Sequence, residues 1–176
     1  MRTTPPRDRT SSVDHAALRD RCRDAVRRNE AALAGLSRSI HAEPETAFAE
    51  HRSAAKVAAL LADHGFTVRQ PVADLDTALV GEFGSGDLVV GVCAEYDALP
   101  QVGHACGHNV IAASAVGAAL ALAEIADEAG LTVRLLGTPA EETGGGKVLM
   151  LERGLFDDVA LAMMVHPGPE DICLPS

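Results

Sequence analysis

The chain has 176 residues, of which 47% are hydrophobic and 23% are charged. This length suits one domain rather than two complete ones, and the apolar fraction is that of a globular protein. The 15 basic and 25 acidic residues give a formal net charge of −10, which provides no basic surface for phosphate backbones, so nucleic acid is not an expected partner. The four cysteines form no CxxC pair, so neither a disulfide framework nor a zinc knuckle is predicted.

The beginning of the chain does not resemble a secretory signal, because it lacks an apolar core. Residues 1–11 are polar, arginine-rich and contain proline, and we expect them to be a disordered leader. The longest apolar stretch, residues 110–126, is rich in alanine and includes Ser114 and Glu124, so it predicts a closely packed buried helix rather than a membrane span. We expect a cytoplasmic protein that binds no membrane.

Two helices are predicted in the first third of the chain. Apolar residues recur at helical spacing among charged ones from residue 13 to about residue 41, and again from about residue 50 to residue 64. Gly65 is placed to end the second helix. Between the two helices, Pro44 keeps Glu43 out of the helical conformation and so predicts an interruption.

Strands are predicted next, over residues 66–72, 76–83 and 87–97. The glycine-containing segment 84–87 predicts a hairpin turn that pairs the last two of them. Residues 88–94 show almost no polar alternation, which indicates a strand buried on both faces of a central sheet.

The second half of the chain alternates between helices and strands. A helix is predicted from about residue 108 to residue 129, followed by a buried strand over 131–139. The glycines at 144–146 open a shorter helix that ends near residue 153, and a last strand covers 159–167. This alternation predicts an α/β fold with an open mixed sheet and helices on both faces.

Polar side chains gather at three places, each directly after a predicted buried strand. They are Glu95, Tyr96 and Asp97, which lead into His104, Cys106 and His108; then Glu141 and Glu142; and last His166. In an open α/β sheet, ligands bind in the crevice beyond the carboxyl ends of the strands. We therefore expect these clusters to meet at one edge of the sheet.

The segment HACGH at 104–108 offers two imidazoles and a thiolate. In an extended loop, residues 104, 106 and 108 project to the same side, where they could bind zinc or another first-row metal. Two alternatives remain. The histidines could be hydrogen-bonded to the backbone of a glycine-bearing loop, or Cys106 and a histidine could form a nucleophilic pair.

The adjacent carboxylates of Glu141 and Glu142 repel each other unless a cation or a raised pKa resolves the conflict. A metal ion would give them different tasks, because one can ligate it while the other accepts a proton from water that the metal activates. The glycines at 144–146 remove side chains where a substrate or the helix start must approach closely. The alternative is a solvated acidic turn.

His166 and Asp97 complete the predicted site. His166 ends an apolar strand and is followed by Pro167; alone it would be read as a core or turn histidine, but beside a cysteine, another histidine and a glutamate it completes a ligand set. Asp97 could accept a hydrogen bond from a ligand histidine and orient it, or it could cap a turn. Glu95 receives no role.

Three segments together resemble the M20 family of metallopeptidases and amidohydrolases: AEYDALPQVGHACGHN, LLGTPAEETGGGKVLMLERGLFDDV and MMVHPGP. The resemblance extends from about residue 14 to about residue 170 and is greatest to the branch of aminobenzoyl-glutamate hydrolase-like proteins and M20-domain dipeptidases. It implies a zinc-exopeptidase-like catalytic domain that holds two divalent metal ions, zinc or manganese. It also implies hydrolysis of amide bonds in small acyl-amino acids or dipeptides.

The resemblance further implies roles for individual residues. The metal ligands would be Cys106, His108, Glu142 and His166. Glu141 would be the general base, which deprotonates the water between the metal ions and passes the proton to the leaving nitrogen. A cysteine ligand favours zinc, although the family uses both metals. Asn109 stands where related amidohydrolases have aspartate, and this fits the aminobenzoyl-glutamate-like branch.

The resemblance also implies a longer protein, since family members carry an inserted lid and dimerisation domain and a returning C-terminal segment with a further histidine ligand. Residues 12–176 would be the N-terminal portion of the catalytic domain, without the domain that forms the family's homodimer. We expect the full-length protein to hydrolyse a small amide or dipeptide, such as aminobenzoyl-glutamate or a β-alanyl dipeptide, and this chain alone to be inactive. The alternatives are an inactive remnant or noncatalytic subunit that keeps the fold, and a thiol hydrolase based on Cys106.

Overall fold

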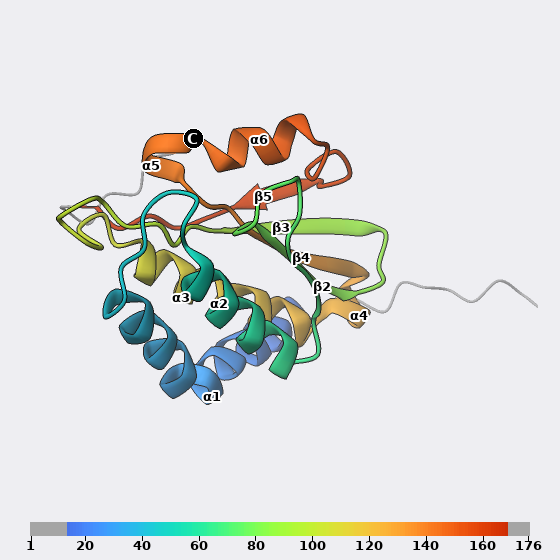
Figure 1. Ribbon diagram of the computed structural model, residues 1–176. Helices are drawn as coiled ribbons and strands as arrows, with labels where there is room; N and C mark the ends of the chain where they lie inside the picture. Colours follow the sequence, from blue (N-terminus) through green and yellow to red (C-terminus); the bar gives the residue numbers. More distant parts are fainter. Residues whose placement is uncertain (1–13, 169–176) are drawn as a thin grey trace, which may run out of the picture.

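The computed structural model describes residues 14–168, which form a sheet with helices on both faces (Figure 1). One face is covered by α1 (His15–His41), α2 (His51–Asp63) and α3 (His108–Ala123), and the other by α5 (Glu141–Gly144) and α6 (Gly146–Glu152). The predicted α/β architecture is confirmed. The leader predicted at residues 1–11 lies outside the described residues.

Within this range the sheet has five strands in the order β1-β2-β4-β3-β5. Their bounds are Thr67–Arg69 (β1), Leu79–Gly84 (β2), Leu88–Ala94 (β3), Leu131–Gly137 (β4) and Leu161–Met163 (β5). β2 runs antiparallel to β1 and β4, whereas β3 runs parallel to β4 and β5. The sheet is therefore mixed, as predicted, and its three parallel strands end at the same edge.

The predicted hairpin between β2 and β3 is wrong, because β4 lies between these two strands and pairs with both. The turn at 84–87 crosses the beginning of β4 instead, where the Gly86 amide donates to the Leu131 carbonyl at 3.2 Å. A Cβ atom at Gly86 would lie 2.0 Å from the carbonyl carbon of Gly130. The absence of a side chain at this position is what allows the two segments to pass so closely.

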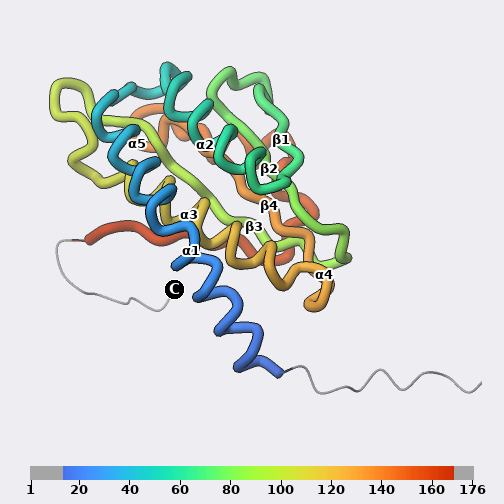
Figure 2. Tube along the Cα trace, turned by 90° about the horizontal axis from the view of Figure 1, so that it is seen from below, coloured from blue at the N-terminus to red at the C-terminus, as the bar shows by residue number. Residues whose placement is uncertain are grey.

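α3 is a buried helix, as its composition predicts. Its side chains pack between α1 and the sheet, and those of Ile111, Val116 and Leu120 are at most 4% exposed. Gly117 allows α1 to approach, since a Cβ atom there would lie 3.1 Å from Leu33 Cδ1, and Figure 2 shows α1 lying against α3. Across residues 14–168, no helix combines the length and the apolar character needed to cross a membrane.

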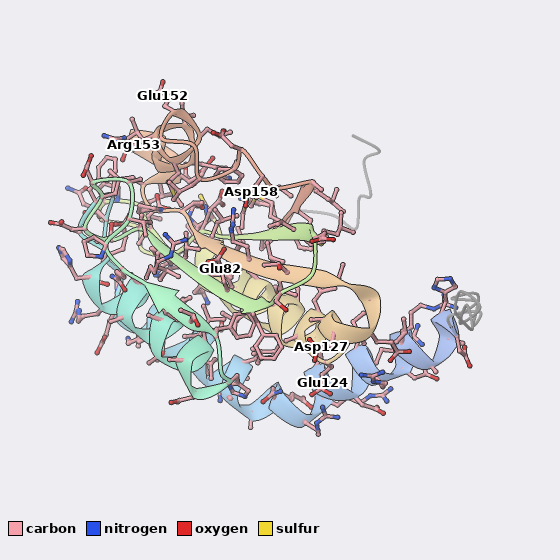
Figure 3. All side chains as sticks on the ribbon, turned by 90° about the vertical axis from the view of Figure 1, so that its right-hand side faces the viewer. Glu82, Glu124, Asp127, Glu152, Arg153 and Asp158 are labelled. Atoms are coloured by element: carbon pink, nitrogen blue, oxygen red, sulfur yellow. The ribbon has the colours of Figure 1, made fainter. Side chains whose placement is uncertain are left out.

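The single helix predicted over 108–129 is in fact two helices. α3 ends before Glu124, and the short α4 (Ala126–Ala129) follows. Glu124 lies beside α1 in Figure 3, where its carboxylate accepts a hydrogen bond from Arg28 at 2.5 Å and its backbone carbonyl accepts one from Arg21. Because the Glu124 carbonyl accepts a hydrogen bond from α1 instead of from a further turn of α3, the break between α3 and α4 is stabilised.

The last strand is shorter than the predicted span 159–167. β5 has three residues, all exposed, and it pairs with β3. The loop that leads into β5 is fixed by Arg134 of β4, whose guanidinium is 2.9 Å from Asp158 Oδ2 and 2.8 Å from Glu82 Oε1 (both carboxylates are labelled in Figure 3). β5 is thus anchored at its beginning, and His166 follows its exposed end.

Candidate metal centre

The predicted polar clusters meet at the edge of the sheet where the parallel strands end. Glu95 and Asp97 directly follow β3, Glu141 and Glu142 begin α5 after β4, and His108 begins α3. Figure 1 shows α5 and the loop between β3 and α3 at the same end of the sheet. Side chains that are far apart along the chain are therefore neighbours in space.

His108 is at the middle of this group and is 1% exposed. Its Nδ1 atom lies 2.9 Å from Asp97 Oδ1, so the Nδ1–H group donates a hydrogen bond to the carboxylate, and the neutral form of the imidazole keeps its lone pair on Nε2. The Nε2 atom faces three carboxylates, at 3.7 Å from Glu95, 3.8 Å from Glu141 and 3.7 Å from Glu142. This arrangement presents one nitrogen and several oxygen atoms to a common point.

The pKa values of His108 and Asp97 move in opposite directions. Burial opposes the charged form of each group, but their mutual hydrogen bond and the charges around them outweigh it, so the pKa of His108 is raised and that of Asp97 is lowered. Asp97 Oδ2 also accepts a hydrogen bond from the Glu142 amide at 3.2 Å. The Asp97 carboxylate therefore stays ionised. It connects His108 to the backbone of the acidic turn, the segment that carries Glu141 and Glu142.

Glu95 also lies in this group of side chains, although the sequence interpretation assigned it no role. It is 1% exposed, and its Oε1 atom accepts a hydrogen bond from Lys147 Nζ at 2.5 Å. Its Oε2 atom has no hydrogen-bond partner among the described residues and points at His108. The signal was available, because a carboxylate directly after an unbroken apolar strand is buried and needs a partner.

His166 approaches the same group from the end of β5. Its ring stands edge-on to that of His108, with 5.8 Å between the ring centroids. His166 Nδ1 lies 2.7 Å from the Pro167 carbonyl, which assigns the proton to Nδ1 and a lone pair to Nε2. Glu95, His108 and His166 thereby offer ligand atoms that all lie within 4.8 Å of one another.

Glu141 and Glu142 form a second group with His108, and its ligand atoms also lie within 4.8 Å of one another. The Glu142 side chain is 27% exposed and that of Glu141 is 42% exposed. The two groups share His108, so the site has two overlapping sets of donors. Glu141 is the more accessible of the two adjacent carboxylates.

Cys106 belongs to neither of these donor groups. The interaction with the neighbouring Glu142 carboxylate, together with partial burial and the other nearby carboxylates, raises the pKa of Cys106 to about 11. The thiol is therefore protonated near neutral pH and is a weak nucleophile, which disfavours a thiol hydrolase. A metal ion bound to this sulfur would have to displace the proton.

His104 does not join Cys106 and His108 as the extended-loop interpretation expects. Gly107 has a left-handed backbone, with φ of 81°, and so turns the chain between the two ends of the segment. His104 is 9% exposed and lies beside His41, with 6.2 Å between the ring centroids. Burial lowers the pKa of His104.

Comparison with known proteins places this site in a family. The model of peptidase family M20/M25/M40 matches residues 91–172. The chain is 40% identical to the Xaa-Arg dipeptidase of Mus musculus across 95% of this chain and 42% of that protein. It is 35% identical to a p-aminobenzoyl-glutamate hydrolase subunit of Escherichia coli across 82% of this chain and 34% of that protein. The chain belongs to the M20 family.

Solved structures share the fold of this M20 chain. A dinuclear metal-binding peptidase of the M20 family from Bacillus subtilis, YXEP, superposes with a TM-score of 0.70 at 29% identity, across 84% of this chain and 44% of that one. An aminobenzoyl-glutamate utilization protein from Klebsiella pneumoniae has a TM-score of 0.67 at 19% identity, across 84% and 46%. The M20 chain thus spans less than half the length of each of these relatives.

The donor set of this M20 chain fits a divalent cation. Glu95 Oε2 and His108 Nε2 are buried 3.7 Å apart, and neither has a hydrogen-bond partner in the part of the chain that the structure describes. Leaving buried polar atoms unpaired is costly, and several carboxylates around one imidazole repel one another. A cation among them would satisfy the two unpaired atoms and offset the negative charge.

Proposed function

We propose that this M20 chain supplies the metal-binding and proton-transfer residues for hydrolysis of amide bonds in small acyl-amino acids or dipeptides. The observation that carries the proposal is the buried Nε2 atom of His108, which faces three carboxylates and has no hydrogen-bond partner among residues 14–168. The Asp97 hydrogen bond fixes the tautomer that a metal ligand requires.

Two divalent cations, zinc or manganese, fit this proposal. The residues that would hold them are His108, Glu142, His166 and Cys106. Glu95 adds a further oxygen donor on the side of His166. Such cations polarise a carbonyl group and lower the pKa of water. The thiol of Cys106 favours zinc, because soft ligands select it over manganese.

Glu141 is proposed as the general base. Its carboxylate is 42% exposed and lies 3.8 Å from His108 Nε2, so it is open to a substrate while remaining beside the donor groups. We assign it the transfer of a proton from the attacking water to the leaving nitrogen. The hydrogen bond from the Glu142 amide to Asp97 fixes the backbone from which the Glu142 carboxylate would hold a cation.

The proposed substrates follow the chemistry named for the relatives, which include a dipeptidase and an aminobenzoyl-glutamate hydrolase subunit. We propose a small amide or dipeptide as the partner, with no role for nucleic acid or membrane, and a cytoplasmic location. The second candidate is a chain that keeps the fold and binds metal without catalysis.

Metal titration and hydrolysis assays on the purified chain and on the full-length protein separate these two functions. If the first is correct, the full-length protein binds two equivalents of zinc or manganese and hydrolyses aminobenzoyl-glutamate, an Xaa-Arg dipeptide or a β-alanyl dipeptide, and the same hydrolysis by this chain alone would exclude the noncatalytic function. Glu141→Gln should then retain the metal and lose turnover by roughly 10²- to 10⁴-fold. Metal binding without hydrolysis of any of these substrates by the full-length protein would support the noncatalytic function, and absence of metal binding would contradict both.

A further inference from the structure

Glu50 is a fully buried carboxylate whose bonds lead away from its own helix. It precedes α2, is 0% exposed, and its side chain does not cap that helix. Its Oε2 atom accepts a hydrogen bond from Thr77 Oγ1 at 2.9 Å, and its Oε1 atom accepts one from the Ala140 amide at 2.8 Å. A buried carboxylate is tolerated only where such bonds replace its hydration. Glu50 therefore joins two distant segments of the chain.

The bond to Ala140 supports an unfavourable backbone conformation. Ala140 has a left-handed backbone, with φ of 56° and ψ of 42°, and it immediately precedes Glu141. Residues with a Cβ atom avoid this region unless the surrounding structure holds them there. The Ala140 carbonyl accepts hydrogen bonds from the amides of Gly144 at 2.9 Å and Gly145 at 2.7 Å. Both polar groups of Ala140 are thus used to shape the turn.

The bond to Thr77 connects the same carboxylate to the end of β3. The Thr77 carbonyl accepts a hydrogen bond from the Tyr96 hydroxyl at 2.5 Å, and Tyr96 is 0% exposed. Tyr96 stands between Glu95 and Asp97 in the sequence. Buried hydrogen bonds therefore link Glu50 to both parts of the site. One path leads through Thr77 and Tyr96 to the end of β3, and the other leads through Ala140 to the turn that carries Glu141 and Glu142.

We propose that Glu50 is a positioning residue for the acidic turn: by holding the Ala140 amide it sets the backbone from which Glu141 and Glu142 face His108. Asp97 holds the next part of the same turn through the Glu142 amide at 3.2 Å. Two buried carboxylates thus fix the turn on either side of Glu141. The consequences for metal binding and catalysis rest on the proposed function, whereas the effect on the turn does not.

Three variants of the chain test this role. Glu50→Leu removes both acceptors, while Glu50→Gln keeps an oxygen for the Ala140 amide and a polar group for Thr77, so it should rescue the turn. Glu45→Leu is the matched control. Glu45 also lies before α2, but it accepts hydrogen bonds from the amides of Arg52 at 3.1 Å and Ser53 at 2.8 Å, which belong to that helix.

The measurements are hydrogen exchange of the Ala140 amide by NMR, referenced to amides in the middle of β4, and zinc affinity by calorimetry. In Glu50→Leu we expect the Ala140 amide to exchange at least about tenfold faster and zinc to bind about tenfold more weakly. In Glu50→Gln we expect the exchange rate and the zinc affinity to stay within about threefold of the wild-type values. Glu45→Leu should change neither. Where hydrolysis is measurable, Glu50→Leu should lower kcat and leave KM unchanged.

Unchanged Ala140 exchange and zinc affinity in Glu50→Leu, or equal losses in Glu45→Leu, would overturn the proposal. If Glu50→Leu does not fold, Thr77→Val is the deciding variant, because it removes one of the two donors to Glu50. It should produce smaller changes of the same kind in Ala140 exchange and zinc affinity, and unchanged values would also overturn the proposal. A full-length protein that binds zinc but hydrolyses nothing would contradict the proposed catalysis alone, since exchange and zinc affinity still report on Glu50.

Discussion

His108 donates a hydrogen bond of 2.9 Å to Asp97, and each of the two side chains is 1% exposed. The bond fixes the imidazole that begins α3 against the residue that follows β3, and it leaves Nε2 directed at the carboxylates of the site. Since Asp97 also binds the Glu142 amide, one carboxylate orients two of the proposed metal ligands. Metal affinity should therefore depend on a residue that need not touch the metal.

Replacing Asp97 by asparagine should weaken zinc binding by roughly 10- to 100-fold, the usual effect of losing the carboxylate behind a ligand histidine. The amide has no charge to stabilise the His108 proton, and it can turn its NH₂ group toward the ring. Calorimetric titration with zinc measures the effect. Asp158→Asn is the control, since Asp158 is exposed and pairs with Arg134 rather than with a residue of the site. Equal zinc affinity in Asp97→Asn and the wild type would show that this hydrogen bond does not orient a ligand.

The raised pKa of His108 predicts how the metal-free chain responds to pH. A histidine whose pKa is raised above its ordinary value of 6.5 stabilises the fold fully below that value, and this contribution is lost as the pH rises through the raised pKa. Asp97, whose pKa is lowered from 3.8, contributes above that value and loses its contribution as the pH falls through the lowered pKa. In chelator, the melting temperature should therefore decline as the pH rises above about 6.5.

Zinc should reverse this decline, because it competes with the proton for Nε2 and binds more tightly as the pH rises. His108→Gln should remove the decline in chelator, since the titrating group is gone. Thermal unfolding from mildly acidic to mildly alkaline pH, with and without zinc, measures both effects. A decline of the same size in His108→Gln would assign the pH dependence to other groups.

The raised pKa of Cys106 gives a separate test of whether its sulfur binds metal. Because this pKa is about 11, the thiol carries its proton near neutral pH, and a bound cation must release it. Calorimetry in buffers of different ionisation enthalpy counts the released protons. Cys106→Ser should release about one proton fewer per chain and bind zinc more weakly, because a serine hydroxyl does not ionise at this pH. An unchanged proton count would exclude Cys106 from the ligand set.

Local patterns predicted the helices and strands of this chain well, but not how the strands pair. Local composition is enough to predict that two elements are buried: the uninterrupted apolar run at 88–94 and the alanine-rich run before residue 124. The hairpin expected at 84–87 failed because β4, more than forty residues later, inserts between β2 and β3. Gly86, which suggested a tight turn, is needed for close packing against Gly130. That contact depends on tertiary structure and has no local signature.

The site was predicted to a similar extent. The convergence of Asp97, His108 and the acidic pair follows from parallel strands ending at one edge, which topology alone explains. The separation of His104 from this group depends on the left-handed turn at Gly107, and the pairing of Glu95 with Lys147 depends on where α6 packs. These are properties of the assembled fold, so spacing along the chain could not reveal them.

Lys147 supplies the positive charge that the buried Glu95 carboxylate needs when no metal is bound. Its ammonium lies 2.5 Å from Glu95 Oε1, and the lysine side chain is 30% exposed, whereas the Glu95 side chain is 2% exposed. Lys147→Met leaves that carboxylate buried without its partner. Because the lysine is partly solvated, we expect a loss of about 1–3 kcal/mol in the free energy of unfolding in chelator, measured by urea denaturation.

Saturating zinc should recover part of this loss if Glu95 faces a bound cation, because the metal then replaces the missing charge. By linkage, the same variant must bind zinc more tightly than the wild type, and calorimetry measures this independently of urea. Lys56→Met is the matched control: its ammonium lies 2.6 Å from Glu43, away from the site, and its loss should leave zinc affinity unchanged. Zinc affinity that stays the same or falls in Lys147→Met would mean that Glu95 is an ion-pair partner only and does not face the metal.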